Sequence, residues 1–292
     1  MLHSSPLTLV HPHNGNLAFQ LFSFDDSSHF DYLQRNNYYS LIWVMEGGGN
    51  ITADFSEYTF GSDVLFAFSP YQPFMIQADV LKGVALCFHP DFFCIHKHQA
   101  EVACNGVLFN NVYQPPFVTI DETSGNTLKM VIEQMKMEMQ NPALAQYELL
   151  VSYLKIALIT LSRLKAEQQQ HPALEAGGSK EPFILQNLKN FIEAHFKTKH
   201  SPSEYAELLH ISPKALAKIT KTHCNKTLSD LITERIIIEA KRELYLTNKA
   251  VKEIAYELGY SDEYYFSRFF KTNANVSPQL YRETVGYGRA EV

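Results

Sequence analysis

Residues Val251 to Arg282 read VKEIAYELGYSDEYYFSRFFKTNANVSPQLYR, the strongest structural signal in the chain. Apolar side chains recur at helical spacing in Val251–Leu258 and again after Asp262. Gly259 stands between the two patterns, where the end of a helix favours a residue that can adopt a left-handed conformation. The stretch therefore predicts two short helices joined by a tight turn. This is the helix-turn-helix arrangement, whose second helix enters a major groove of DNA.

An ordinary helical hairpin is the alternative for this stretch, but a second copy of the pattern upstream argues against it. A short amphipathic helix is expected over 202–209 and another over 213–223, with Ser212 as N-cap and Pro213 at the first helical position. Between the two pairs, residues 228–247 contain no Pro or Gly and predict one long helix. The sequence thus predicts two helix-turn-helix units joined by a long linker helix.

The same residues resemble the DNA-binding domain of the AraC/XylS transcriptional regulators. The resemblance covers about the last third of the chain, and its matching elements are Ala240-Lys241, Leu244, Ile254-Ala255, Gly259-Tyr260, Tyr265-Phe266, Arg268-Phe269-Phe270-Lys271, Ser277-Pro278 and Tyr281-Arg282. It implies that the second helix of each unit contacts DNA. The contacts implied are Lys214, Ala217, Lys218 and Lys221 on the first, and Asp262, Glu263, Tyr264, Ser267, Arg268 and Lys271 on the second. Ala217 departs from the polar residue common in relatives.

Charge is distributed unevenly along the 292 residues, whose formal net charge is −6. Residues 1–182 hold 9 Lys and Arg against 18 Asp and Glu, whereas residues 183–285 hold 15 against 12. This asymmetry fits a DNA-binding module joined to a module that does not bind DNA. A solvated helix face is the alternative explanation for the lysines at 214, 218 and 221.

The N-terminal half predicts β-strands over 38–46, 50–59, 64–69, 74–77 and 84–88, separated by Gly and Pro. We expect Gly47-Gly48-Gly49 to break the first two strands apart. The order of strands and turns resembles the small cupin barrel that many AraC-type regulators carry as a sensor. We therefore expect an α+β protein with an antiparallel β cupin-like barrel and flanking helices ahead of an all-α domain. Tyr39, Trp43, Phe66 and Phe68 are candidate effector-binding residues, although they could simply fill the core.

Metal and catalytic sites find little support. The strand that carries the metal-binding His-x-His of many cupins has Tyr39, Leu41 and Trp43 here. Residues 87–98 (CFHPDFFCIHKH) contain metal-ligand types without a recognised spacing, so solvated loop histidines are the simpler interpretation. The four cysteines are spread out and are expected to be free thiols. No phosphate-binding loop or GxSxG motif is present. We predict no catalytic residues, no metal and no cofactor.

Three further segments complete the predicted organisation. Helices are expected over 124–140 and 145–168, each with an apolar stripe that could pack on its own domain or form a dimer seam. A polar linker is expected over 168–181, which gives a cupin-like effector-binding and dimerisation domain over 1–167 and a DNA-binding domain over 182–285. Residues 1–16 are either a mobile arm or disordered, and contain no evident signal peptide.

These features predict a cytoplasmic, sequence-specific DNA-binding transcriptional regulator, an activator or a repressor, controlled by an unidentified small molecule. Its expected partners are double-stranded DNA, RNA polymerase and a second copy of itself, with no membrane. The alternatives are a cupin-type metabolite- or carbohydrate-binding protein with a helical tail for protein contacts, and a cupin enzyme.

Overall fold

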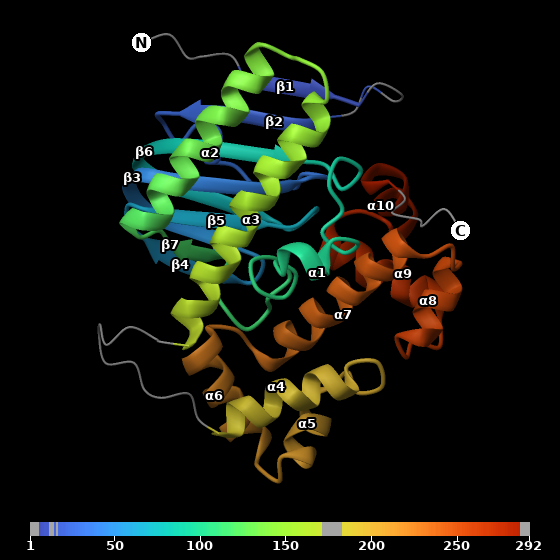
Figure 1. Ribbon diagram of the computed structural model, residues 1–292. Coiled ribbons are helices and arrows are strands. Elements are labelled where there is room, and N and C mark those ends of the chain that lie inside the picture. Colours follow the sequence, from blue (N-terminus) through green and yellow to red (C-terminus); the bar gives the residue numbers. More distant parts are fainter. Residues whose placement is uncertain (1–5, 12–14, 16, 171–182, 287–292) are drawn as a thin grey trace. The chain divides into compact units, whose positions relative to one another are not determined.

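The structure is a computed structural model that describes residues 6–11, 15, 17–170 and 183–286 (Figure 1). The chain divides into two compact units, formed mostly by residues 1–172 and by residues 173–292. Within the described ranges, no helix combines the length and the apolarity needed to cross a bilayer.

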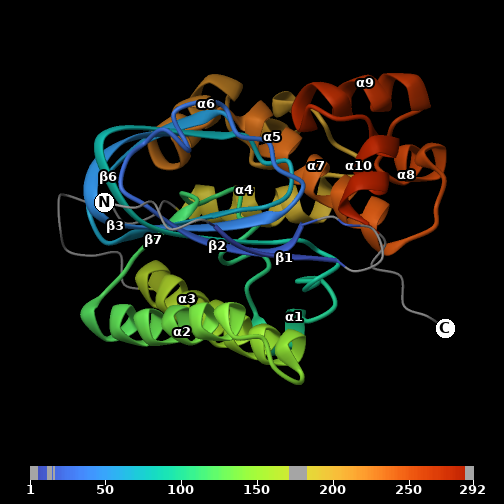
Figure 2. The ribbon, with the colours of Figure 1, turned by 90° about the horizontal axis from the view of Figure 1, so that it is seen from above.

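The first unit is built on one seven-stranded sheet. Its strands are β1 Leu7–Val10, β2 Leu17–Phe24, β3 Tyr39–Ala53, β4 Ser56–Phe60, β5 Val64–Phe68, β6 Phe74–Phe88 and β7 Phe117–Thr119. They follow the order β1-β2-β6-β3-β5-β7, with β4 paired to β3 off this path. All of the pairings along this path are antiparallel, as the sequence predicts. Seen from above, the sheet curves strongly (Figure 2).

Two expected strand breaks are wrong, because β3 and β6 each run unbroken for 15 residues. The glycines of β3 allow close approach to β6 instead of ending the strand. A Cβ on Gly47 (φ 109°) would lie 2.0 Å from the carbonyl oxygen of Val80, and one on Gly49 would lie 2.1 Å from that of Gln77. The pairing also shifts register between Val44 and Glu46 and again between Gly48 and Gly49. The glycines therefore mark bulges, which bend a strand without ending it.

The N-terminal segment also differs from expectation. Leu7–Val10 forms strand β1 and pairs with β2, so this part of the predicted arm belongs to the sheet. Residues 1–5, 12–14 and 16 lie outside the described residues.

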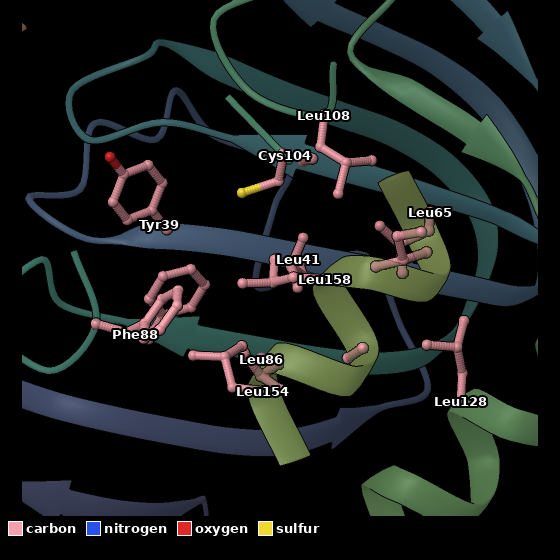
Figure 3. Packing of buried hydrophobic residues seen from close by; sticks show 14 of the residues in the cluster. Tyr39, Leu41, Leu65, Leu86, Phe88, Cys104, Leu108, Leu128, Leu154 and Leu158 are labelled. Atoms are coloured by element: carbon pink, nitrogen blue, oxygen red, sulfur yellow. The ribbon is translucent and has the colours of Figure 1, made fainter. Parts of the chain in front are cut away.

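Three helices accompany the sheet: α1 Gln99–Val102, α2 Glu122–Gln140 and α3 Gln146–Gln170. Asp121 caps α2 by accepting from the backbone N–H of Ser124 at 2.7 Å. Figures 1 and 2 show α2 and α3 side by side over one face of the sheet. The predicted stripes face inward: Leu128, Val131 and Met135 of α2 and Leu150, Leu154, Ala157, Leu158 and Leu161 of α3 are buried. Figure 3 shows Leu154 and Leu158 beside Leu41 and Leu86 of the strands.

Helix α3 also holds the edge strand β7. The side-chain amide of Gln168 donates to the carbonyl of Thr119 at 2.6 Å and accepts from the N–H of Thr119 at 3.3 Å. One turn earlier, the Lys165 ammonium donates to the Phe117 carbonyl, and burial lowers the pKa of this lysine to about 8. The helix continues to Gln170, into the predicted linker over 168–181, whose remainder lies outside the described residues.

The second unit is helical. Its helices are α4 Phe183–His195, α5 Pro202–Leu208, α6 Pro213–Cys224, α7 Leu228–Leu246, α8 Val251–Glu257, α9 Glu263–Ala274 and α10 Pro278–Val285. The five helices predicted here are present, and each predicted boundary agrees with the structure to within one residue. Helix α5 packs on α6 and helix α8 packs on α9, and α7 contacts both α6 and α9. In the described part of the second unit, two helical pairs are therefore connected by the long helix α7, which we call the rod.

Candidate nucleic-acid interface

The first helical pair, α5–α6, is held by polar caps at both helix starts. The carboxylate of Glu204 accepts from the backbone N–H of Ser201 at 2.9 Å and from that of His200 at 3.1 Å. These hydrogen bonds, first of all from Ser201, lower the pKa of Glu204. His210 takes the left-handed conformation in the turn (φ 54°). The hydroxyl of Ser212 then accepts from the N–H of Ala215 at 3.2 Å, which starts α6 as the sequence predicts.

The second pair, α8–α9, has a turn that only glycine can make. Gly259 has φ +83°, and a Cβ there would lie 2.2 Å from the carbonyl oxygen of Lys197. A carboxylate oxygen of Asp262 accepts from the N–H of Tyr264 at 2.6 Å and from that of Tyr265 at 3.0 Å. Asp262 is therefore the N-cap of α9, and the carboxylate oxygen Oδ1 is occupied by this role.

Helix α6 buries one face and exposes the other. Leu216, Thr220 and Cys224 are buried, at intervals of four residues. The predicted contacts Lys214, Ala217, Lys218 and Lys221 are all exposed. The structure therefore places all four on the outward side of α6.

Helix α9 repeats this division. Phe266, Phe270 and Ala274 are buried. Of the predicted contacts, Asp262, Tyr264, Arg268 and Lys271 are exposed and Glu263 and Ser267 are half-buried. Tyr265, 57% exposed, is absent from the predicted set although the aromatic doublet at 264 and 265 was visible in the sequence.

The rod α7 fixes the two pairs at a defined separation. Its 19 residues correspond to a length of about 28 Å. Thr227 and Asp230 form a capping box at its start. At its end, Arg282 of α10 donates to the carbonyl of Leu244 at 3.1 Å and to that of Lys249 at 2.7 Å. The matched Arg282 is thus a structural residue that anchors α10.

The candidate effector residues of the first unit do not lie together. Tyr39 and Trp43 belong to the cluster that packs beneath α2 and α3, where the Tyr39 ring is 5.1 Å from that of Phe88. Phe66 and Phe68 belong to a separate cluster, and the Phe68 ring stacks on Phe74 at 3.9 Å. Neighbouring positions of a strand point to opposite faces, and 39 and 43 share one face of β3. A single pocket lined by all four residues is therefore ruled out.

The His- and Cys-rich segment has ordinary polar partners. His98 lies 2.7 Å from a carboxylate oxygen of Glu101, and the Cys87 thiol contacts the Ser40 hydroxyl at 3.8 Å. Burial raises the pKa of the Cys87 thiol to about 12. In the part of the chain that the structure describes, no three His, Cys, Asp or Glu side chains gather as a metal site.

Comparison with known proteins agrees with this geometry. The model of a helix-turn-helix domain family matches residues 205–284. The chain is 24% identical over 255 residues to YfiF of Bacillus subtilis, an uncharacterized HTH-type transcriptional regulator, and this match covers 86% of the chain and 78% of YfiF. It is 30% identical over 97 residues to RafR, the raffinose operon transcriptional regulatory protein of Pediococcus pentosaceus, and covers 33% of this chain but only 35% of RafR.

Among solved structures, ToxT of Vibrio cholerae aligns with 91% of this chain and 98% of its own, at 16% identity and a TM-score of 0.41. The curated relatives are named as regulators of transcription, which confirms the predicted regulator over the enzyme alternative. The matched domain, the two helical pairs and these relatives show that residues 205–284 form a helix-turn-helix domain of the AraC type, which occurs in transcriptional regulators.

Proposed function

We propose that the outward faces of α6 and α9 bind successive major-groove segments on one side of duplex DNA, about 34 Å apart. The observation that carries the proposal is that the predicted contacts of both helices lie on outward faces, while the residues between them fill the core. Arg and Lys can donate to guanine, and a Glu carboxylate can accept from cytosine N4. Lys271, near the end of α9, is assigned to a phosphate.

The regulatory partners form the second part of the proposal. We assign control by a small molecule to a cupin-type sensor in the first unit. The buried aromatic cluster of Phe66, Phe68 and Phe74 is the part of this unit that we assign to binding such a molecule. We further propose that the DNA-bound protein activates transcription through RNA polymerase. This would take place in the cytoplasm, where the DNA is found.

The proposed homodimer uses side chains that the first unit's own core leaves exposed. These are Met130 and Met137 of α2 and Ile156 of α3, which are 62%, 58% and 43% exposed. Sedimentation of the full chain at micromolar concentration is expected to show a dimer, and a monomer would exclude this part of the proposal.

The test of DNA binding is a gel shift with native genomic fragments, followed by sequencing of the bound sites. Replacing Lys218 or Arg268 by Ala is expected to weaken binding to a recovered site by about 1–3 kcal/mol. Lys129→Ala is the matched control, because it removes the same charge from an exposed position of α2. Unchanged affinity and sequence preference in both α6 and α9 variants would contradict the docking arrangement.

A further inference from the structure

The two DNA-facing helices can be compared position by position, because each has 12 residues and each follows its N-cap directly. Ser212 corresponds to Asp262, and both helices end at an asparagine in the left-handed conformation, Asn225 and Asn275. Corresponding positions therefore differ by 50 in residue number. The same scaffold presents two different sets of side chains to DNA.

The charges on the two helices differ. Helix α6 carries Lys214, Lys218 and Lys221 and no acidic residue. Helix α9 with its cap carries two acids and two bases, which are Asp262, Glu263, Arg268 and Lys271. Helix α6 is therefore strongly attracted to the phosphate backbone at long range. Helix α9 with its cap has a net charge close to zero, so its long-range attraction is weak.

The exposed face of α6 has few groups that can distinguish base pairs. Ala215 and Ala217 end in methyl groups, whose one selective contact is the methyl group of thymine. Its lysines are point charges on flexible stems, which suits them to phosphates more than to a fixed base edge. The face of α6 therefore favours affinity without much selectivity.

Helix α9 has the opposite character. Positions are counted from the first residue of each helix. Position 6 of α9 is Arg268, whose planar guanidinium can contact guanine O6 and N7 through two parallel hydrogen bonds. Position 1 is Glu263, an acceptor for cytosine N4. Position 2 is Tyr264, 75% exposed, whose backbone N–H is fixed by Asp262 at 2.6 Å. These groups can reject wrong bases, because a mismatched partner leaves them unpaired.

The core beneath α9 also contains more aromatic rings than the core beneath α6. The ring of Tyr260 lies 5.2 Å from that of Phe266, and the ring of Phe270 lies 5.8 Å from that of Tyr281. At the equivalent positions α6 buries Leu216 and Thr220. A reading group needs a fixed position to select among bases, and the aromatic core supplies one.

We infer that the two units divide DNA recognition: α9 reads the base sequence and α6 supplies sequence-independent affinity through phosphates. The operator then consists of one block of defined sequence and a degenerate segment one helical turn away. This inference rests on the proposed DNA-binding function, and goes beyond it by naming Tyr264 and Arg268 as the residues that determine specificity.

Selection of bound duplexes from a random pool by the full chain tests the inference. The Lys214→Ala, Lys218→Ala, Lys221→Ala triple variant is expected to recover the same sequence block as the wild-type protein. Its affinity is expected to fall at least about tenfold at physiological salt, and the slope of log affinity against log salt to fall by about 2–3, or about 0.9 per phosphate contact.

The reciprocal variant Glu263→Ala, Tyr264→Ala, Arg268→Ala is expected to lose the sequence block and to keep its binding to non-specific DNA within a few-fold. Arg268→Lys is the matched control, because it keeps the charge and removes the planar fork. It is expected to relax the preference for guanine at one position and to leave the salt dependence unchanged. Preserved thermal unfolding of each variant confirms that the fold is intact.

Two outcomes would overturn the inference: two blocks of equal selectivity in the wild-type pool, or altered base preferences in the triple-lysine variant. A wild-type chain that enriches no duplex and binds none would instead refute the proposed function itself. The two failures are therefore distinguishable.

Discussion

The turns of the two helical pairs place different residues in the left-handed conformation. In α5–α6 the left-handed position is His210, a residue with a full side chain, and one residue fewer separates the helices than in α8–α9. In α8–α9 it is Gly259, against which the Lys197 carbonyl packs too closely for any Cβ. We therefore expect the first pair to tolerate substitution in its turn and the second pair not to tolerate it.

The cores show the same contrast. Positions 4, 8 and 12 are Leu216, Thr220 and Cys224 in α6 and Phe266, Phe270 and Ala274 in α9. Aromatic rings bury more apolar area than these aliphatic and polar side chains and constrain one another's orientation. The duplicated motif thus has one copy with an aromatic core and one with a mixed aliphatic and polar core, and the aromatic core lies beneath the helix to which we assign base reading.

The two helices are expected to differ most in stability at position 8, counted from the first residue of each helix. Phe270→Ala removes the ring that contacts Phe266 and Tyr281 and is expected to destabilise α8–α10 by about 3–5 kcal/mol. Thr220→Ala, at the same position of α6, removes a hydroxyl that donates to the Ala217 carbonyl and is expected to lose about 1 kcal/mol. Amide hydrogen exchange of peptides from α5–α6 and α8–α10 measures each pair separately. Equal losses would show that the cores are equivalent.

The turns are expected to give the next largest difference. Gly259→Ala combines left-handed strain of about 1–2 kcal/mol with overpacking of about 1–3 kcal/mol against Lys197. His210→Gly relieves the same kind of strain and is expected to change stability by about 1 kcal/mol or less. Thermal unfolding and exchange of the turn peptides provide the measurement. A Gly259→Ala protein as stable as the wild type would show that the Lys197 carbonyl moves aside.

The N-caps of α6 and α9 are expected to differ in their contribution to stability. Asp262→Ala leaves two backbone N–H groups without their acceptor, whereas Ser212→Ala leaves one. Cap losses are typically about 1 kcal/mol, so Asp262→Ala is expected to be the more destabilising by a fraction of that. Asp262→Asn is the control that keeps an acceptor and removes the charge. Fraying of each helix start, measured by exchange at 264–265 and at 215, reports the effect.

The smallest effect is expected from pH. The pKa of Glu204 is lowered from its ordinary value of 4.5, so the folded state favours the ionised carboxylate. Its contribution is fully present above this ordinary value and is lost as pH falls through the lowered pKa of the folded state. The side chain is half-buried at the surface, where solvent screens its interactions, so only a slight loss of α5 protection is expected in acid. Glu204→Gln is expected to lack this acid dependence, and an identical pH profile in the variant would exclude Glu204 as its source.

The sequence predicts the second unit better than the first for a physical reason. Ser212, Pro213, Gly259 and Asp262 are local signals whose meaning depends on neighbours a few residues away. The contacts are implied by the family resemblance, and helical periodicity sets them on the side of each helix away from the core once those ends are set. The structure accordingly places them on outward faces.

The first unit lacks such local signals. Every residue of β5 is buried, so alternation cannot tell which face Phe66 occupies relative to Trp43. Gly47 and Gly49 resemble a turn in sequence, and their role becomes clear only from the carbonyls of a strand that lies about thirty residues later. Long-range pairing therefore decides both the strand boundaries and the candidate effector face.

The side chain of Gln168 has one more consequence. A sheet edge normally exposes backbone groups that can recruit a strand from another molecule, and this is a common route to aggregation. The amide of Gln168 on α3 pairs with both backbone groups of Thr119, as a neighbouring strand would, so these groups are not available to another molecule. We therefore expect these hydrogen bonds to disfavour self-association at β7, a strand that contains no proline and no charged residue.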